Sequence, residues 1–146
     1  MRDGLVDSAV TIVDVFGADT GLRQQLNLVE TALERHPDAD YLIGSAPAVE
    51  AAIGLRATRT DLPQPLLLST YISHTIMRGL MNGRVVAASF DDPTLQGVMA
   101  IRQAASVNGM LVSSTPIGPD IKLLTPADET LNQIQISPAD YFPTIR

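Results

Sequence analysis

The spacing of apolar residues is the feature that most restricts the fold of this chain. Five short apolar runs, at residues 10–15, 41–44, 66–69, 85–89 and 121–124, alternate with segments whose apolar residues recur every three or four positions. Such alternation is typical of repeated βα units around a mostly parallel sheet. The sequence therefore predicts an α/β fold of three layers, with helices on both faces of the sheet.

The segments between the runs carry helix signals. In the first segment, the apolar residues that share one helical face are Leu22, Leu26, Val29 and Leu33. They recur at intervals of three or four, and Pro37 follows shortly after the last of them. A proline disfavours helical backbone in the residue before it. We therefore expect a helix that ends before Pro37.

Helix starts can be read from two N-cap and proline pairs. Ser45 precedes Pro47, and Asp92 precedes Pro93. A small polar residue followed by a proline in the first turn is typical of a helix N-terminus. A third, shorter helix should follow Ser73 and end at the Asn-Gly pair of residues 82–83. Residues 108–120 lose periodicity and gather Gly, Ser and Pro, which indicates a loop.

Composition limits the classes of partner. The chain has 146 residues, a formal net charge of −6 and no cysteine. Nucleic acids and anionic membranes both favour clustered lysine and arginine, so neither is an expected partner. A disulfide framework and a thiolate metal site are excluded. No apolar stretch approaches the length of a membrane span, and the first residues contain no apolar signal-peptide core.

The motifs of the common enzyme classes are missing. The sequence contains no G-x-G-x-x-G, no P-loop, no G-x-S-x-G and no H-E-x-x-H. Its two histidines, His36 and His74, fall on different elements without the spacing of a metal or triad site. His36 belongs to a helix C-terminus, where a partly positive ring is favourable. We therefore predict no catalytic residue, no metal site and no cofactor.

Ligands of open α/β sheets bind where the parallel strands end. The candidate ligand-binding residues at these ends are Ser45, Tyr71, His74 and Asp91. Tyr71 is either loop packing or a π face for a cationic or methylated ligand, and His74 is either a loop or cap residue or a ligand contact. Asp92 is already explained as an N-cap. Asp91 is therefore the acidic residue of this pair that remains a candidate for ligand binding.

Several stretches resemble the type I periplasmic binding proteins, and within them the branch that senses trimethylamine N-oxide. They are Leu-Glu-Arg-His-Pro at 33–37, Ser-Thr-Tyr-Ile-Ser-His at 69–74 with Arg-Gly-Leu at 78–80, the segment 83–97, and Leu-Leu-Thr-Pro at 123–126. The resemblance extends over residues 10–127. It implies a flavodoxin-like or Rossmann-like lobe, with residues 1–146 forming the C-terminal lobe of a two-lobed protein.

The resemblance also implies a function. Two lobes of this family close around a small ligand without chemistry, and the protein reports to the periplasmic domain of a sensor histidine kinase. The expected ligand is similar to trimethylamine N-oxide, the expected location is the periplasm, and Asp91 stands where relatives place a polar ligand residue. The helix of residues 93–107 would pack on the first lobe. Its uncovered face leads us to expect either a homodimer of the isolated half or a refolding of the helix onto its own sheet.

Other interpretations remain open at this point. The chain could be a free-standing α/β interaction domain, or it could bind another small solute. Sugar ligands are disfavoured, because the strand ends carry Ala46, Pro47 and Tyr71 where sugar-binding relatives place acidic side chains. A small enzyme would need a nucleophile or base that the sequence does not offer.

Overall fold

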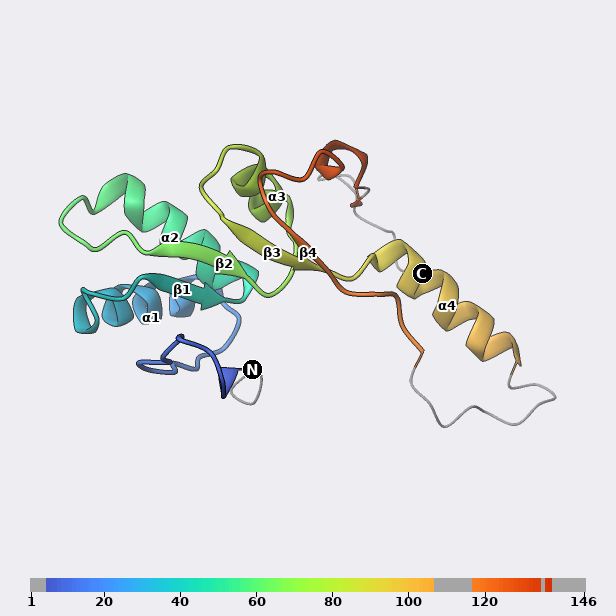
Figure 1. Cartoon of the computed structure of the whole chain (residues 1–146), viewed down its shortest axis with the longest axis horizontal. Coiled ribbons are helices and arrows are strands. Elements are labelled where there is room, and N and C mark those ends of the chain that lie inside the picture. Colours follow the sequence, from blue (N-terminus) through green and yellow to red (C-terminus); the bar gives the residue numbers. More distant parts are fainter. Residues whose placement is uncertain (1–4, 107–116, 135, 138–146) are drawn as a thin grey trace. The chain divides into compact units, whose positions relative to one another are not determined.

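The chain folds as an α/β protein. A computed structural model describes residues 5–106, 117–134 and 136–137 (Figure 1). Four strands form one mostly parallel sheet in the order β1-β2-β3-β4, and helices flank it. The predicted fold class is therefore confirmed. The chain divides into two compact units, Met1–Leu68 and Ser69–Arg146, which are described in turn.

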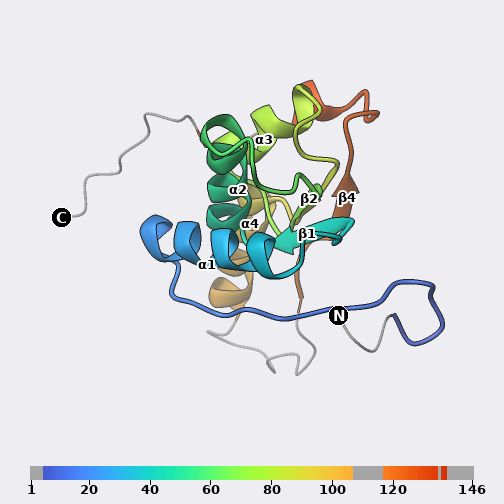
Figure 2. The same ribbon diagram turned by 90° about the vertical axis from the view of Figure 1, so that its left-hand side faces the viewer.

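The first unit is a helical layer packed on the start of the sheet. Its elements are α1 (Leu22–Arg35), β1 (Tyr41–Gly44), α2 (Ala46–Thr58) and most of β2 (Leu66–Ser69). Helix α1 packs against α2, and α2 packs against β1 (Figure 2). The buried apolar side chains of this layer include Val29, Leu33, Val49, Ala52 and Leu67. Both strands and both helices fall where the sequence predicts them.

The buried face of α1 differs from the predicted one. Val29 and Leu33 are buried, but Leu22 is 58% exposed and the third buried residue of the helix is Gln25. The Gln25 amide donates hydrogen bonds to the backbone oxygens of Ala18 at 3.4 Å and Asp19 at 2.8 Å. A buried amide with two acceptors avoids the cost of an unpaired polar group. Gln25 therefore ties the preceding segment to the helix.

The predicted strand at residues 10–15 is wrong. No strand is present there, and Val10, Val13 and Val15 are each more than half exposed. Strand β1 pairs directly with β2, and the amide of Leu66 donates to the oxygen of Asp40 at 2.8 Å. The apolar run therefore has strand composition but no strand neighbour.

The end of this run is attached to the C-terminus of α1. The Asp14 carboxylate accepts a hydrogen bond from Nε2 of His36 at 2.9 Å and lies 3.9 Å from Arg35. The Phe16 ring meets the His36 ring edge-on at 6.1 Å, and Arg35 lies over the same ring at 5.4 Å. His36 is the C-cap residue of α1, at the helix C-terminus where the sequence predicts it.

We predict that this attachment weakens in acid. The hydrogen bond from His36, the strongest of several causes, holds the pKa of Asp14 below its ordinary value of 3.8. A carboxyl group with a lowered pKa in the folded state stabilises the fold above its unfolded pKa, and that stability is lost as the pH falls through the folded value. Urea unfolding should therefore show a deficit for Asp14→Asn at pH 5 that shrinks toward pH 3. A deficit independent of pH would contradict this.

The second unit contains α3 (His74–Met81), β3 (Ala87–Phe90), α4 (Pro93–Ser106), β4 (Lys122–Leu124) and the short 3-10 helix η2 (Leu131–Gln133). Strands β3 and β4 are antiparallel, with Ala88 opposite Leu124. The Ser73 side chain caps α3 by accepting from the amide of Ile76 at 3.2 Å. Helix α3 ends at Met81 with Asn82 as its C-cap, and Gly83 has φ +72°, a conformation that favours glycine. The predicted short helix is confirmed.

Helix α4 begins as predicted but leaves its apolar face exposed. The Asp92 carboxylate accepts from the amide of Leu95 at 3.0 Å, which confirms the N-cap. Leu95 and Val98 are exposed, and Ile101 is 72% exposed. Most of the predicted loop at 108–120 lies outside the described residues. Among the described helices, none combines the length and apolar character that a membrane crossing requires.

Candidate functional site

Ser45 stands at the carboxyl end of β1, in the first unit. It is the N-cap residue of α2, its backbone is extended, and a proline follows in the first turn. Its hydroxyl makes no capping hydrogen bond. The cap position is therefore confirmed, whereas the side chain is not used for the capping that the sequence suggests.

Tyr71 follows β2 in the second unit, two residues beyond the strand. Its side chain is exposed, with 42% of the residue surface accessible. Its backbone oxygen accepts a hydrogen bond from Oγ of Ser69 at 2.7 Å, and Ser69 itself is buried. A buried hydroxyl at the strand end therefore fixes the backbone from which the ring projects.

His74 is the first residue of α3, directly after the N-cap Ser73. Its Nε2 lies 2.5 Å from the backbone oxygen of Ser137, so this nitrogen carries the proton and donates. The contact joins two positions 63 residues apart in the sequence. This is a structural role of the kind that the loop or cap interpretation describes, and it leaves a ligand role for His74 untested.

Asp91 comes directly after β3 and is exposed. Its backbone oxygen accepts from the side-chain amide of Gln96 at 2.7 Å. Its neighbour Asp92 uses its carboxylate as the N-cap of α4 and has φ +25°. The two acids therefore differ in role as predicted, since only Asp92 caps the helix.

The sheet places three of the four candidates at one edge. Strands β2 and β3 are neighbours in a mostly parallel sheet, so the residues that follow them, Tyr71 with His74 and Asp91, lie at the same edge. The fourth candidate, Ser45, belongs to the first unit. In chemical terms the edge offers an aromatic face, a carboxylate and an imidazole whose Nε2 is already engaged. Among the described residues no cluster of metal-ligating side chains is present.

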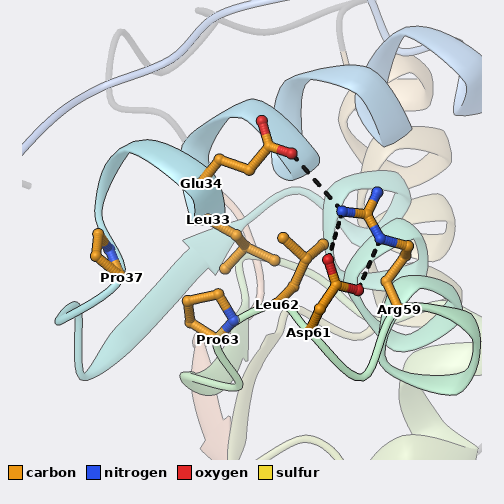
Figure 3. A pocket seen from close by; sticks show the side chains of 7 residues that line it. All are labelled: Leu33, Glu34, Pro37, Arg59, Asp61, Leu62 and Pro63. Carbon is orange, nitrogen blue, oxygen red and sulfur yellow. Dashed lines mark hydrogen bonds and ion pairs between the residues drawn. The ribbon is translucent and has the colours of Figure 1, made fainter.

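The hollow in Figure 3 belongs to the first unit, whereas Tyr71, His74 and Asp91 belong to the second. It is an open depression in the first unit, lined by Leu33, Glu34, Pro37, Arg59, Asp61, Leu62 and Pro63. Leu33 and Glu34 lie in the last turn of α1, and the other lining residues follow the C-terminal ends of α1 and α2 rather than the ends of strands. The site that sequence reasoning indicates and the hollow are therefore different places.

Arg59 is the charged centre of this hollow, and sequence reasoning missed it. It pairs with Glu30, with Asp61 at 2.8 Å and with Glu34 at 3.8 Å. The hydrogen bond with Asp61 raises the pKa of Arg59 and lowers that of Asp61. The one available signal was Glu30 and Glu34 at helical i, i+4 spacing. The cluster links α1 to the end of α2 and has the form of a structural ion-pair network.

Comparisons with known proteins identify relatives among solute-binding proteins. The periplasmic protein TorT of Escherichia coli K12 is 38% identical over 146 residues, which is 97% of this chain and 42% of TorT. The chain thus spans less than half the length of this relative. No protein-family model matches the chain.

Solved structures give the same relationship. A chain of the complex between the TorS sensor domain and TorT, without ligand, matches at a TM-score of 0.78 and 34% identity over 99% of this chain and 50% of that one. The same complex in the presence of TMAO matches at 0.78 and 33% identity, over 99% of this chain and 49% of that one. A solute-binding protein of an ABC transporter from Bradyrhizobium sp. BTAi1, with bound bis-tris, matches at 0.80 and 28% identity, over 99% and 44%.

These relatives are non-enzymatic periplasmic binding proteins. The chain is therefore a homologue of the periplasmic protein TorT over one lobe of that protein, with the fold of one lobe of a non-enzymatic periplasmic binding protein.

Proposed function

We propose that this chain is the ligand-binding second lobe of a two-lobed periplasmic sensor for a small solute similar to trimethylamine N-oxide. The lobe supplies one wall of a cleft, and closure of the cleft is reported to a sensor histidine kinase. The proposal is supported by the homology to TorT, whose structure with the TorS sensor domain includes one in the presence of TMAO.

The observation that carries the proposal is the exposed ring of Tyr71 at the carboxyl end of β2. A trimethylated nitrogen spreads positive charge over three methyl groups and offers no hydrogen-bond donor. An aromatic face attracts such a group, whereas a carboxylate would also attract unrelated cations. Tyr71 is therefore proposed as the part of an aromatic cage that this lobe contributes.

The other candidates take polar roles in the proposal. Asp91 and Ser45 stand directly after β3 and β1 and present a carboxylate and a hydroxyl. The oxide oxygen needs donors, and Ser45 can donate, whereas Asp91 can donate only when protonated. His74 uses Nε2 in its contact with the backbone oxygen of Ser137, so a ligand contact would use its other ring nitrogen or require that bond to open.

Helix α4 is proposed to pack on the first lobe of the two-lobed protein. Its exposed residues Leu95, Val98 and Ile101 recur at intervals of three and therefore share one face. An apolar helix face of this kind favours burial against a partner surface. In the proposal, residues 93–107 thus belong by packing to the neighbouring lobe.

A second candidate ligand has a specific observation in its favour. The Bradyrhizobium relative, which matches the whole of this chain, was solved with bis-tris, a tertiary amine that carries hydroxyl groups. A solute of that chemistry would place its amine against Tyr71 and a hydroxyl against Asp91. The ligand is then another small amine rather than an amine oxide.

Substitution of Tyr71 tests the proposal. In a two-lobed protein that joins this chain to a first lobe, Tyr71→Ala should weaken trimethylamine N-oxide binding by up to about thirtyfold, because a desolvated cation–π contact contributes about 2 kcal/mol. Tyr71→Phe keeps the ring and should weaken binding much less. Titration calorimetry measures both.

The control separates the ring from the general stability of the site. Leu66→Ala removes an exposed side chain from β2, the strand that precedes Tyr71, and should leave the affinity for ligand unchanged. If Tyr71→Ala and Tyr71→Phe both bind as tightly as the parent, Tyr71 is loop packing. The methylated-ligand class then loses its main support within this chain.

A further inference from the structure

The first unit exposes a free sheet edge and an unpaired strand-forming run at the same time. Strand β1 stands at one end of the sheet order, with β2 on one side and no strand of the described residues on the other. The run of residues 10–15, Val-Thr-Ile-Val-Asp-Val, has five β-branched residues of six and is exposed. Both features promote strand pairing between chains.

The backbone of β1 shows which groups are unpaired. The oxygen of Asp40 accepts from Leu66 on β2, and backbone groups of alternate residues in a strand point to opposite sides. The backbone amide and carbonyl groups of Tyr41 and Ile43 therefore point to the outer edge. The side chains of both residues are also about half exposed, so an added strand would cover apolar surface there.

The run is held away from the edge of its own copy. Asp14 is bound by His36 at the C-terminus of α1, and the oxygens of Ala18 and Asp19 are bound by Gln25 near its N-terminus. The segment between these ties follows the helix rather than β1, and Figure 2 shows the run as a separate extended segment outside the sheet. Pairing with its own β1 would have to break these contacts.

We propose that two copies of this chain associate by strand addition, in which the run 10–15 of each copy pairs with the outer edge of β1 in the other. The occupant is a second copy because run and edge belong to the same unit, so that two copies satisfy each other reciprocally through an isologous contact. The side chains of Val10, Val13 and Val15 supply apolar contact, and the free groups of Tyr41 and Ile43 supply hydrogen bonds. The net charge of −6 opposes this association, so added salt should strengthen it.

Sedimentation velocity of the purified 146-residue chain, over a range of concentrations, tests the proposal. We expect a monomer–dimer equilibrium whose dissociation constant rises at least tenfold in Val13→Asp and in Val13→Pro, the second because proline removes a backbone donor. Val13 is 62% exposed, so both variants should keep the fold of the monomer, which far-UV circular dichroism checks. Ile121→Asp, at a residue that is 75% exposed and lies outside both surfaces, is the matched control and should dimerise like the parent, whereas Ile101→Asp tests the alternative contact through α4.

Hydrogen exchange locates the contact. The amides of Tyr41 and Ile43 should gain protection as the concentration rises, and this gain should vanish in Val13→Pro. A chain that stays monomeric, or a dimer that is lost in Ile101→Asp but kept in both Val13 variants, would overturn the proposal; the second result would assign association to α4. Protection of both amides in the monomer would also overturn it, because it would mean that the run pairs within its own copy.

Discussion

Titration of the isolated 146-residue chain with trimethylamine N-oxide should give millimolar binding or none. The best small ligands gain about 1.5 kcal/mol per non-hydrogen atom when fully enclosed, and this ligand has five such atoms, so only a closed cleft can approach micromolar affinity. One lobe presents one wall and encloses about half of those contacts. The binding free energy of the isolated lobe is then at most about 4 kcal/mol, which corresponds to a millimolar dissociation constant.

The affinity of the isolated chain is to be compared with that of the same chain joined to a first lobe. That two-lobed protein should bind at least a hundredfold more tightly, since most of a small ligand's surface is buried only between two walls. Circular dichroism must show that the isolated chain is folded. Micromolar affinity in a folded monomer would disprove the two-wall argument and would point to a complete site within this chain.

Local patterns in the sequence predicted the elements that depend on local interactions. The N-cap at Asp92, the short helix after Ser73 and its end at the Asn-Gly pair were read from residue type alone, and each is present; Ser45 holds its predicted N-cap position without a side-chain capping bond. These signals succeed because a cap or a positive φ is decided within a few residues of chain. Strands β1 and β2 follow from their apolar runs for a similar reason.

Long-range packing produced the failures. Residues 10–15 have the composition of a strand, but a strand also needs a neighbour, and β1 pairs with β2 instead. The buried face of α1 includes Gln25, because its amide finds two backbone acceptors upstream that no helical period reveals. The Arg59 cluster joins residues from α1 and from the end of α2, so its charges were visible in the sequence but their meeting was not.

The candidate site was predicted in position rather than in chemistry. Tyr71, His74 and Asp91 stand after neighbouring strands, as the βα pattern requires. The hydroxyl of Ser69 beneath Tyr71 and the bond between His74 and Ser137 could not be predicted, because the first depends on a turn and the second crosses 63 residues. Periodicity therefore identifies the sheet edge that carries the candidate residues, and only the three-dimensional structure identifies which of their groups are already engaged.

The contact between β1 and α2 depends on a missing side chain. A Cβ at Gly44 would lie 2.9 Å from Cβ of Ala48, closer than two such atoms can approach, and near Leu42 and Val49 at 3.8 and 3.9 Å. Ala48 is buried in the first turn of α2, beside the fully buried Val49, so neither atom can move without shifting helix or strand. Glycine at this position therefore sets how closely the helix packs on the strand.

Gly44→Ala should destabilise the chain by about 1 to 3 kcal/mol, the usual cost of overpacking a tight contact. The backbone there is not left-handed, so an alanine without a clash would be neutral or slightly favourable, and the sign of the change in stability reports the clash.

In Gly44→Ala/Ala48→Gly the methyl group moves from helix to strand, and the double variant should be more stable than the sum of the two single changes predicts. Gly54→Ala, in the same helix with nothing within 4 Å of the added carbon, should instead stabilise by up to about 1 kcal/mol. Urea unfolding of the parent and the four variants measures all these differences. If the changes at Gly44 and Ala48 prove additive, β1 and α2 do not approach each other as closely as the structure describes.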